Sequence, residues 1–192
     1  MNHFLLSVIF SVLSVFSVVK SPLANIGPAP EVALVDQSDR PFRLSGLRGK
    51  VVLVSFVYTT CNGSCPATTR EMVRVKKALE KEGLWGKKVE FVSISLDPER
   101  DTPEVLARYA KQFGAESGSW HFLTGPTARV DKTIAAWDMW ARRNASGVLD
   151  HPSRVFLVDP RGRQREIYSL VFLTPEAVVA DARGLLAEAE EP

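Results

Sequence analysis

Cysteine is scarce in this chain of 192 residues, which contains only Cys61 and Cys65. A pair four residues apart cannot connect distant parts of a fold, and this excludes the small secreted domains built on a disulfide framework. In an oxidising compartment, two thiols at this spacing either pair with each other or hold a metal ion. The low cysteine count therefore leaves two roles for the pair, redox chemistry and metal binding.

An excess of one charge sign is also lacking. The chain has 24 Lys and Arg residues against 22 Asp and Glu residues, a net charge of +2, and it has no basic stripe. Without the electrostatic footprint of a nucleic-acid-binding protein, we expect no nucleic-acid partner. The sequence shows no internal repeat, and 45% of its residues are hydrophobic. These features are typical of one globular domain of ordinary size with a short extra segment.

Long hydrophobic runs are confined to the N-terminus, where residues 4–19 include only Ser as a polar residue. The run is shorter than the roughly 20 residues of a full membrane span, and it fits the hydrophobic region of an export signal. No Lys or Arg precedes it, and Pro22 is poorly placed for cleavage after Ala24. We therefore predict that residues 1–24 form a signal peptide or an uncleaved N-terminal membrane anchor. Both alternatives place the rest of the chain outside the cytoplasm.

The remaining chain alternates between strand and helix patterns. After a Gly/Pro-rich linker at 25–30, residues 31–47 predict a β-hairpin, and the β-branched run 51–58 predicts a strand buried on both faces. Further strands are expected at 89–96, 120–123, 154–158 and 164–169, and helices at 66–82, 103–113, 127–137 and 175–189. This order predicts an α/β fold of the thioredoxin-like type, with a central mixed sheet flanked by helices and an N-terminal β-hairpin.

Both cysteines lie where the predicted strand 51–58 ends and the next helix begins. The free N–H groups and the dipole at a helix N-terminus stabilise thiolate over thiol, so we expect lowered thiol pKa values here. Residues four apart in a helical turn lie on the same face. The sulfurs of Cys61 and Cys65 can then converge on one ion or form one disulfide.

Four sequence blocks resemble those of the Sco/SenC family. Residues 54–66 (VSFVYTTCNGSCP) resemble its signature of a strand, Thr, C-x-x-x-C and Pro. The other three blocks follow in the family's order at 93–103 (SISLDPERDTP), 120–125 (WHFLTG) and 150–162 (DHPSRVFLVDPRG). The similarity runs from about residue 34 to residue 186, and four ordered blocks are more specific than a lone C-x-x-x-C.

The resemblance implies that residues 31–192 form a thioredoxin-like Sco/SenC domain at the periplasmic face of the inner membrane, or in the periplasm. The family binds copper through two Cys and one His, which by position are Cys61, Cys65 and His151. Asp97 matches an acidic position near the family's site but is not expected to be a ligand. Two thiolates and an imidazole suit Cu(I) and can hold Cu(II), whereas a structural zinc site takes four ligands.

The first functional hypothesis is therefore a copper-binding metallochaperone that assists assembly of the binuclear copper centre of cytochrome c oxidase. Its implied partner is the copper-bearing subunit of the oxidase or another copper chaperone, and its N-terminus binds the inner membrane if it is not cleaved. Three protein ligands leave an open coordination position, which a protein that hands over its metal needs. On this hypothesis the protein is a carrier rather than an enzyme.

The alternative is a thiol–disulfide oxidoreductase that reduces cysteines of a periplasmic or membrane partner. Cys61 and Cys65 would then be the catalytic, redox-active pair. Residues 152–159 resemble the stretch of periplasmic thioredoxin-like reductases in which a cis proline faces the disulfide, so a cis Pro152 would favour this function. Loss of His151 should weaken copper binding by a carrier, whereas a reductase should keep much of its thiol-exchange rate, which depends on thiolate pKa and access. A peroxiredoxin-type peroxidase is disfavoured because its motif positions are occupied by Val54 and Tyr58.

Other residues with metal-binding or acid–base side chains are expected to have structural roles. His121 lies in an apolar strand, and Met72 and Met139 are typical of core filler, so packing is expected rather than metal binding. Asp97 and Asp101 precede a predicted helix and are expected to form a turn and a helix cap rather than an acid–base pair, with Thr102 as the alternative cap.

Overall fold

The computed structural model describes residues 23–191, so the predicted leader at 1–24 lies outside the described residues except for its last two positions. Within this range, no helix has the length and apolar character needed to cross a membrane. The strands are β1 Gly27–Pro28, β2 Ala33–Val35, β3 Pro41–Arg43, β4 Val51–Val57, β5 Val89–Ser95, β6 Trp120–Leu123, β7 Arg142–Arg143, β8 Leu149–Asp150, β9 Val155–Val158 and β10 Arg163–Tyr168. The helices are α1 Ser64–Lys81, α2 Pro103–Phe113, α3 Thr127–Ala136 and α4 Pro175–Glu190, with a short 3₁₀ helix at Leu44–Leu47.

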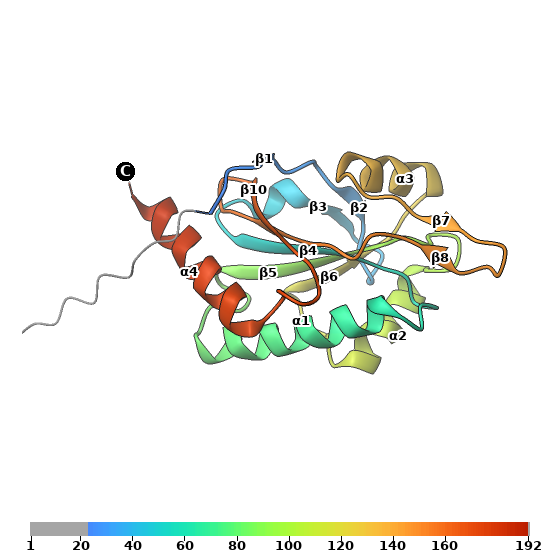
Figure 1. Ribbon diagram of the computed structural model, residues 1–192, viewed down its shortest axis with the longest axis horizontal. Helices are drawn as coiled ribbons and strands as arrows, with labels where there is room; N and C mark the ends of the chain where they lie inside the picture. Colours follow the sequence, from blue (N-terminus) through green and yellow to red (C-terminus); the bar gives the residue numbers. More distant parts are fainter. Residues whose placement is uncertain (1–22, 192) are drawn as a thin grey trace, which may run out of the picture.

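Six strands form one mixed sheet in the order β1-β10-β9-β4-β5-β6 (Figure 1). Strands β4, β5 and β6 are parallel, while β9 is antiparallel to β4 and β10 is antiparallel to β9. Every residue of the central strand β4 is buried, as its run of β-branched and aromatic residues predicts. The mixed sheet confirms the predicted fold class, and its central strand leads directly into the segment that carries the two cysteines.

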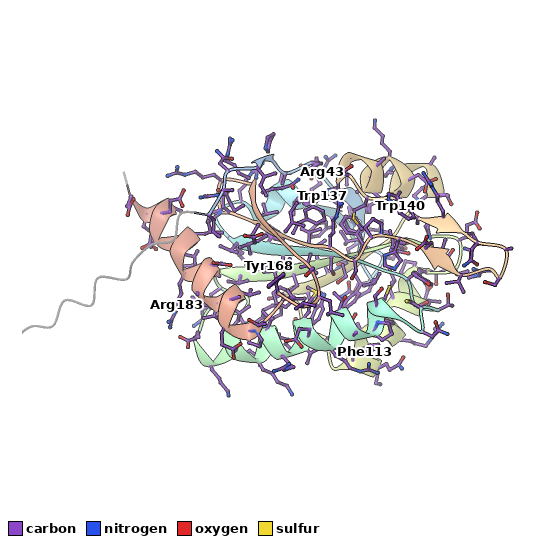
Figure 2. The ribbon with its side chains drawn as sticks, viewed as in Figure 1. Arg43, Phe113, Trp137, Trp140, Tyr168 and Arg183 are labelled. Carbon is purple, nitrogen blue, oxygen red and sulfur yellow. The ribbon has the colours of Figure 1, made fainter. Side chains whose placement is uncertain are left out.

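Helices cover both faces of this sheet, as predicted (Figure 1). On one face, Leu53 of β4 packs in a core with Met72 of α1 and with residues of α2 and α4. On the other, Phe56 of β4 contacts the ring of Trp137 beside α3, and the β2–β3 hairpin closes the same core. Figure 2 shows Trp137 between the sheet and α3. The alternation of side chains along β4 therefore supplies both cores at once.

Two segments are more ordered than the sequence indicates. Gly27–Pro28, within the predicted linker, forms β1 and pairs with β10. The pattern of residues 138–148 predicts an irregular stretch or a strand followed by a loop, and the structure has the antiparallel pair β7–β8 there and at 149–150. Strands of two residues are too short to produce a hydrophobic period, so the sequence pattern gives no signal for them.

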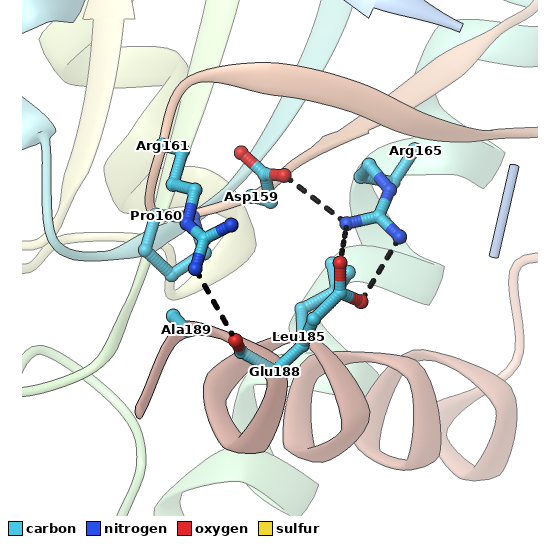
Figure 3. A pocket seen from close by; sticks show the side chains of 7 residues that line it. All are labelled: Asp159, Pro160, Arg161, Arg165, Leu185, Glu188 and Ala189. Atoms are coloured by element: carbon cyan, nitrogen blue, oxygen red, sulfur yellow. Dashed lines mark hydrogen bonds and ion pairs between the residues drawn. The ribbon is translucent and has the colours of Figure 1, made fainter. Parts of the chain in front are cut away.

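A buried arginine holds the start of the described chain against the domain. Arg165 of β10 makes ion pairs with Asp159 and Glu188 at 3.2 and 2.9 Å, and these groups line a small pocket beside α4 (Figure 3). Its guanidinium also donates to the carbonyls of Leu23 and Ala24, both at 3.0 Å. The chain therefore enters the domain beside α4, at the end of the molecule opposite the β7–β8 hairpin (Figure 1).

Candidate metal centre

The two cysteines occupy different depths at the junction of β4 and α1. Cys61 lies in the loop and is half-buried, whereas Cys65 lies in the first turn of α1 and is only 1% exposed. No side chain caps the helix at Gly63, and the sulfur of Cys61 instead accepts the Gly63 N–H at 3.4 Å. The sulfur of Cys61 thus accepts a hydrogen bond from a free N–H group at the helix N-terminus, as a capping oxygen usually does.

His151 completes a cluster with these cysteines. The ligand atoms of Cys61, Cys65 and His151 all lie within 4.8 Å of one another, and this is the only such group of three found among residues 23–191. The His151 Nε2 lies 3.5 Å from the Cys65 sulfur, while its Nδ1 lies 2.8 Å from the carbonyl oxygen of Pro152. Because a carbonyl can only accept, Nδ1 carries the proton and the Nε2 lone pair faces the sulfurs.

The environments of the two thiols shift their pKa values in opposite directions. Burial raises the pKa of Cys61, but hydrogen bonds from the backbone of Cys65 and Gly63 and from Tyr58 outweigh it, and the net pKa is lowered. Burial raises the pKa of Cys65 far above its usual range, and the Cys61 thiolate raises it further. The prediction of a thiolate favoured by the helix N-terminus is therefore wrong for Cys65, because desolvation dominates there.

Tyr58, the residue after β4, links the cysteine loop to the histidine segment. Its ring meets the His151 ring edge to face at a centroid distance of 5.7 Å, and its hydroxyl donates to the Leu149 carbonyl at 3.2 Å. Burial, followed by the adjacent Cys61 thiolate, raises the pKa of Tyr58 to about 12. Tyr58 therefore stays protonated at neutral pH and remains a hydrogen-bond donor.

A buried aspartate holds the other side of the cysteine loop. Asp101 is 0% exposed and accepts hydrogen bonds from Thr59, through its N–H at 3.3 Å and its hydroxyl at 2.5 Å, and from the Ser95 hydroxyl at 2.7 Å. Asp101 is not the helix cap, because the Thr102 hydroxyl accepts the Val105 N–H at the start of α2. Of the two expected caps, Thr102 is confirmed and Asp101 is wrong; Asp101 instead braces the segment that precedes Cys61.

Asp97 is also buried, at 3% exposure, and its carboxylate bonds two arginines. Arg100 donates to one oxygen at 3.0 Å, and Arg143 of β7 donates to the other at 2.9 Å. The main-chain carbonyl of Asp97 accepts the N–H groups of Arg100 and Asp101 at 3.0 and 2.8 Å, which forms the expected turn. Asp97 is thus not one of the three clustered donor residues, and it connects the loop after β5 to β7 instead.

A family model described as SCO1/SenC matches residues 28–187 of this chain. The chain belongs to the SCO1/SenC family.

Individual relatives and solved structures are similar to this chain over most of its length. A putative copper-binding protein of Stutzerimonas stutzeri is 37% identical over 140 residues, covering 71% of this chain and 66% of the relative. The structure of Bradyrhizobium japonicum ScoI with copper bound is 29% identical, with a TM-score of 0.71 over 83% of this chain and 99% of that one. The structure of BsSco, described as having a disulfide switch and as a member of the Sco family of cytochrome c oxidase assembly proteins, is 26% identical, with a TM-score of 0.71 over 83% and 93% of the two chains. These neighbours confirm the Sco-type fold.

The remaining candidates have structural environments in this Sco domain. The Nε2 of His121 lies 2.9 Å from Glu90, which also pairs with Lys50, so His121 belongs to a partly buried polar group and not to the Cys61–Cys65–His151 cluster. Met72 and Met139 are 1% and 3% exposed and pack in the two cores. Met72 and Met139 therefore have the packing roles that the sequence indicates, while His121 pairs with Glu90.

Pro152 follows His151 through a trans peptide bond, since residues 23–191 contain no cis peptide. The sequence leaves the isomer of this bond open, and the cis form that would favour thiol exchange is not the one observed. The Pro152 carbonyl instead orients the imidazole of His151.

The donor set fits copper. Two sulfurs and one imidazole nitrogen are soft and borderline ligands, which suit Cu(I) and can also hold Cu(II). Only Cys65 is fully buried, while Cys61 and His151 are half-buried, so an incoming ligand can reach two of the three donors. Sequence reasoning missed the roles of Tyr58 and Arg143, and the only signal for Tyr58 was its place between the strand and the C-x-x-x-C segment.

Proposed function

We propose that this chain binds one copper ion through Cys61, Cys65 and His151 and serves as a metallochaperone in the assembly of cytochrome c oxidase. The observation that carries the proposal is the convergence of the three donors within 4.8 Å, with the His151 Nε2 free to coordinate. The copper-bearing subunit of the oxidase, or another copper chaperone, is the proposed partner. The copper-bound ScoI structure and the oxidase-assembly description of BsSco support this function.

The arrangement suits a protein that gives up its metal. Three protein donors leave a coordination position open, so a donor from the partner can bind before any of the three dissociates. Cys61 and His151 lie at the surface side of the site, whereas Cys65 lies beneath them. Ligand exchange would therefore begin at Cys61 or His151 and end at Cys65.

The proposed location is the periplasmic face of the inner membrane or the periplasm. The hydrophobic run at 4–19 supports export or anchoring. The described domain begins beside α4, away from the metal centre, so an anchor at this end leaves the centre accessible.

A second function, thiol–disulfide exchange with a partner dithiol, is favoured by the low pKa of Cys61 next to the sulfur of Cys65. A more accessible cysteine of lowered pKa beside a buried thiol is the usual arrangement of attacking and resolving cysteines. The disulfide switch of BsSco supports a redox role for such a pair.

An anaerobic Cu(I) titration of the reduced chain against a competing chelator separates the two functions. A copper carrier should bind one equivalent, with weaker binding in His151→Ala and none in the Cys61→Ser/Cys65→Ser double variant. Binding that is indifferent to His151, or no competitive binding, would rule out the three-ligand carrier. The reduction potential of the Cys61–Cys65 pair would then be measured against periplasmic dithiols.

A further inference from the structure

The histidine that completes the metal centre is carried by a hairpin outside the main sheet. β7 and β8 form a separate two-stranded sheet, and in Figure 1 the hairpin projects from the end of the molecule beyond α3. His151 directly follows β8, which ends at Asp150. The position of His151 over the sulfurs therefore depends on whatever fixes this hairpin to the domain.

Leu149 of β8 is buried in the core and its carbonyl accepts the Tyr58 hydroxyl, and Arg143 of β7 makes the charged part of the connection. Its Nη1 donates to the Gly147 carbonyl at 2.8 Å, which closes the turn of the hairpin. Its Nη2 donates to Asp97 Oδ1 at 2.9 Å, in the loop after β5. In the strand register Arg143 lies opposite Leu149, two residues before His151. The guanidinium of Arg143 thus closes the turn of the hairpin and also joins the hairpin to the rest of the domain.

Asp97 is a fixed acceptor for this contact. Its N–H donates to the Ser95 hydroxyl at 3.0 Å, and Arg100 occupies its second carboxylate oxygen. The same Ser95 hydroxyl donates to Asp101, which accepts two hydrogen bonds from Thr59, two residues before Cys61. Asp97 is therefore tied to the network that braces the cysteine loop.

We propose that Arg143 is a positioning residue for the metal centre, which through Asp97 sets the His151-bearing hairpin in register with the Cys61 loop. This inference rests on the proposed copper-binding function. Without Arg143, both thiols keep their places at the β4–α1 junction, but the hairpin loses its charged contact with the domain. His151 then coordinates the copper ion in a smaller fraction of the molecules, and the ion is held mainly by the two sulfurs.

The chain contains a matched control one residue away. Arg142 lies on the same strand, is exposed like Arg143, and stacks over the Trp140 ring at 5.1 Å. Arg143→Met and Arg142→Met remove the same charge and keep a similar side-chain volume, but only the first removes the Asp97 contact. Arg143→Lys keeps the charge without the two-pronged geometry and should restore part of the function.

The first readout is amide hydrogen exchange of the full chain without metal. The Asn144 N–H is bonded to the Val148 carbonyl across the hairpin, and its protection should fall about tenfold in Arg143→Met, which corresponds to one charge-assisted hydrogen bond. Arg142→Met should match the unmodified chain. Equal protection in both variants would overturn the proposal.

The second readout is the Cu(II) electron paramagnetic resonance spectrum and the rate of copper release to a chelator. Arg143→Met should weaken the nitrogen hyperfine signal and speed release, whereas Arg143→Lys should fall in between. In a His151→Ala background, the Arg143→Met change should have no further effect on release. An equal effect in that background would overturn the positioning role. Absence of copper binding in every variant would contradict the proposed function instead, while the exchange measurement would still test the hairpin contact.

Discussion

Replacing Tyr58 by Phe tests how the protein couples the cysteine loop to the histidine segment. The side chain is 4% exposed, and the change removes only its hydroxyl, which donates to the Leu149 carbonyl at 3.2 Å. A buried hydrogen bond of this kind contributes about 1 kcal/mol to the free energy of unfolding. For a domain of this size, that loss lowers the midpoint of thermal unfolding by roughly 3 °C. The ring contact with His151 is kept, so the expected loss comes from the hydroxyl alone.

The same substitution should change the chemistry of Cys61. The single proton of the Tyr58 hydroxyl can turn from the Leu149 carbonyl to the Cys61 thiolate, and this bond is one of the causes that lower the pKa of Cys61. Tyr58→Phe should therefore raise that pKa. The pH dependence of alkylation by iodoacetamide measures it, because the buried Cys65 reacts slowly. The expected result is an alkylation profile displaced to higher pH.

Tyr109→Phe is the matched control, since its hydroxyl lies 2.8 Å from the Thr69 hydroxyl in the core. We expect a similar loss of stability but no displacement of the Cys61 profile. If Tyr58→Phe left the profile unchanged, or if both variants displaced it equally, the proposed stabilisation of the Cys61 thiolate by the Tyr58 hydroxyl would be refuted.

Three further predictions concern groups away from the metal centre. Burial raises the pKa of Glu90, but the hydrogen bonds and charges of His121 and Lys50 outweigh burial, and the net pKa is lowered. The ionised Glu90 therefore stabilises the fold above pH ~4.3, and this stabilisation is lost as the pH falls through the lower pKa of the folded state. Urea unfolding should accordingly show a stability deficit of Glu90→Gln at pH 7 that shrinks toward pH 3, and a pH-independent deficit would contradict this. Arg165→Met strands the buried Asp159 carboxylate and should cost about 3 kcal/mol by the same assay, and a loss below about 1 kcal/mol would mean that the pair is solvated. Gly162→Ala should cost about 1 kcal/mol because the residue has φ +74 and its Cβ would displace the Arg48 guanidinium, and an unchanged unfolding midpoint would argue against that backbone conformation.

The sequence predicted those parts of the fold whose cause is local. The run at 51–57 forms a buried strand because β-branched side chains suit a sheet covered on both faces. Helix α2 begins after Thr102 and ends before Gly114, which adopts the left-handed conformation at φ 64. In each case the deciding residues lie within or next to the element, so a pattern along the chain suffices.

The supporting structure of the site was less predictable because its contacts join distant segments. Arg143 and Asp97 are 46 residues apart, and neither lies in a pattern that pairs them. The raised pKa of Cys65 likewise follows from burial beneath the loop and not from its place in the first turn of α1. Sequence motifs therefore indicated the ligand set, while the orientation and protonation of the ligands required the folded chain.

Folding contributes unequally to the three donors of the proposed copper site. Cys61 and Cys65 are close in the chain and stay close when it unfolds, whereas His151 lies 86 residues beyond Cys65 and reaches it only in the folded state. A ligand that binds both states stabilises the fold only by the difference between its two affinities. Because unfolded thiols retain much of their affinity for Cu(I), copper bound at the proposed site would stabilise this domain mainly through His151 and the fixed geometry of the sulfurs. The hairpin that carries His151 is therefore the part of the structure through which metal binding and folding are coupled.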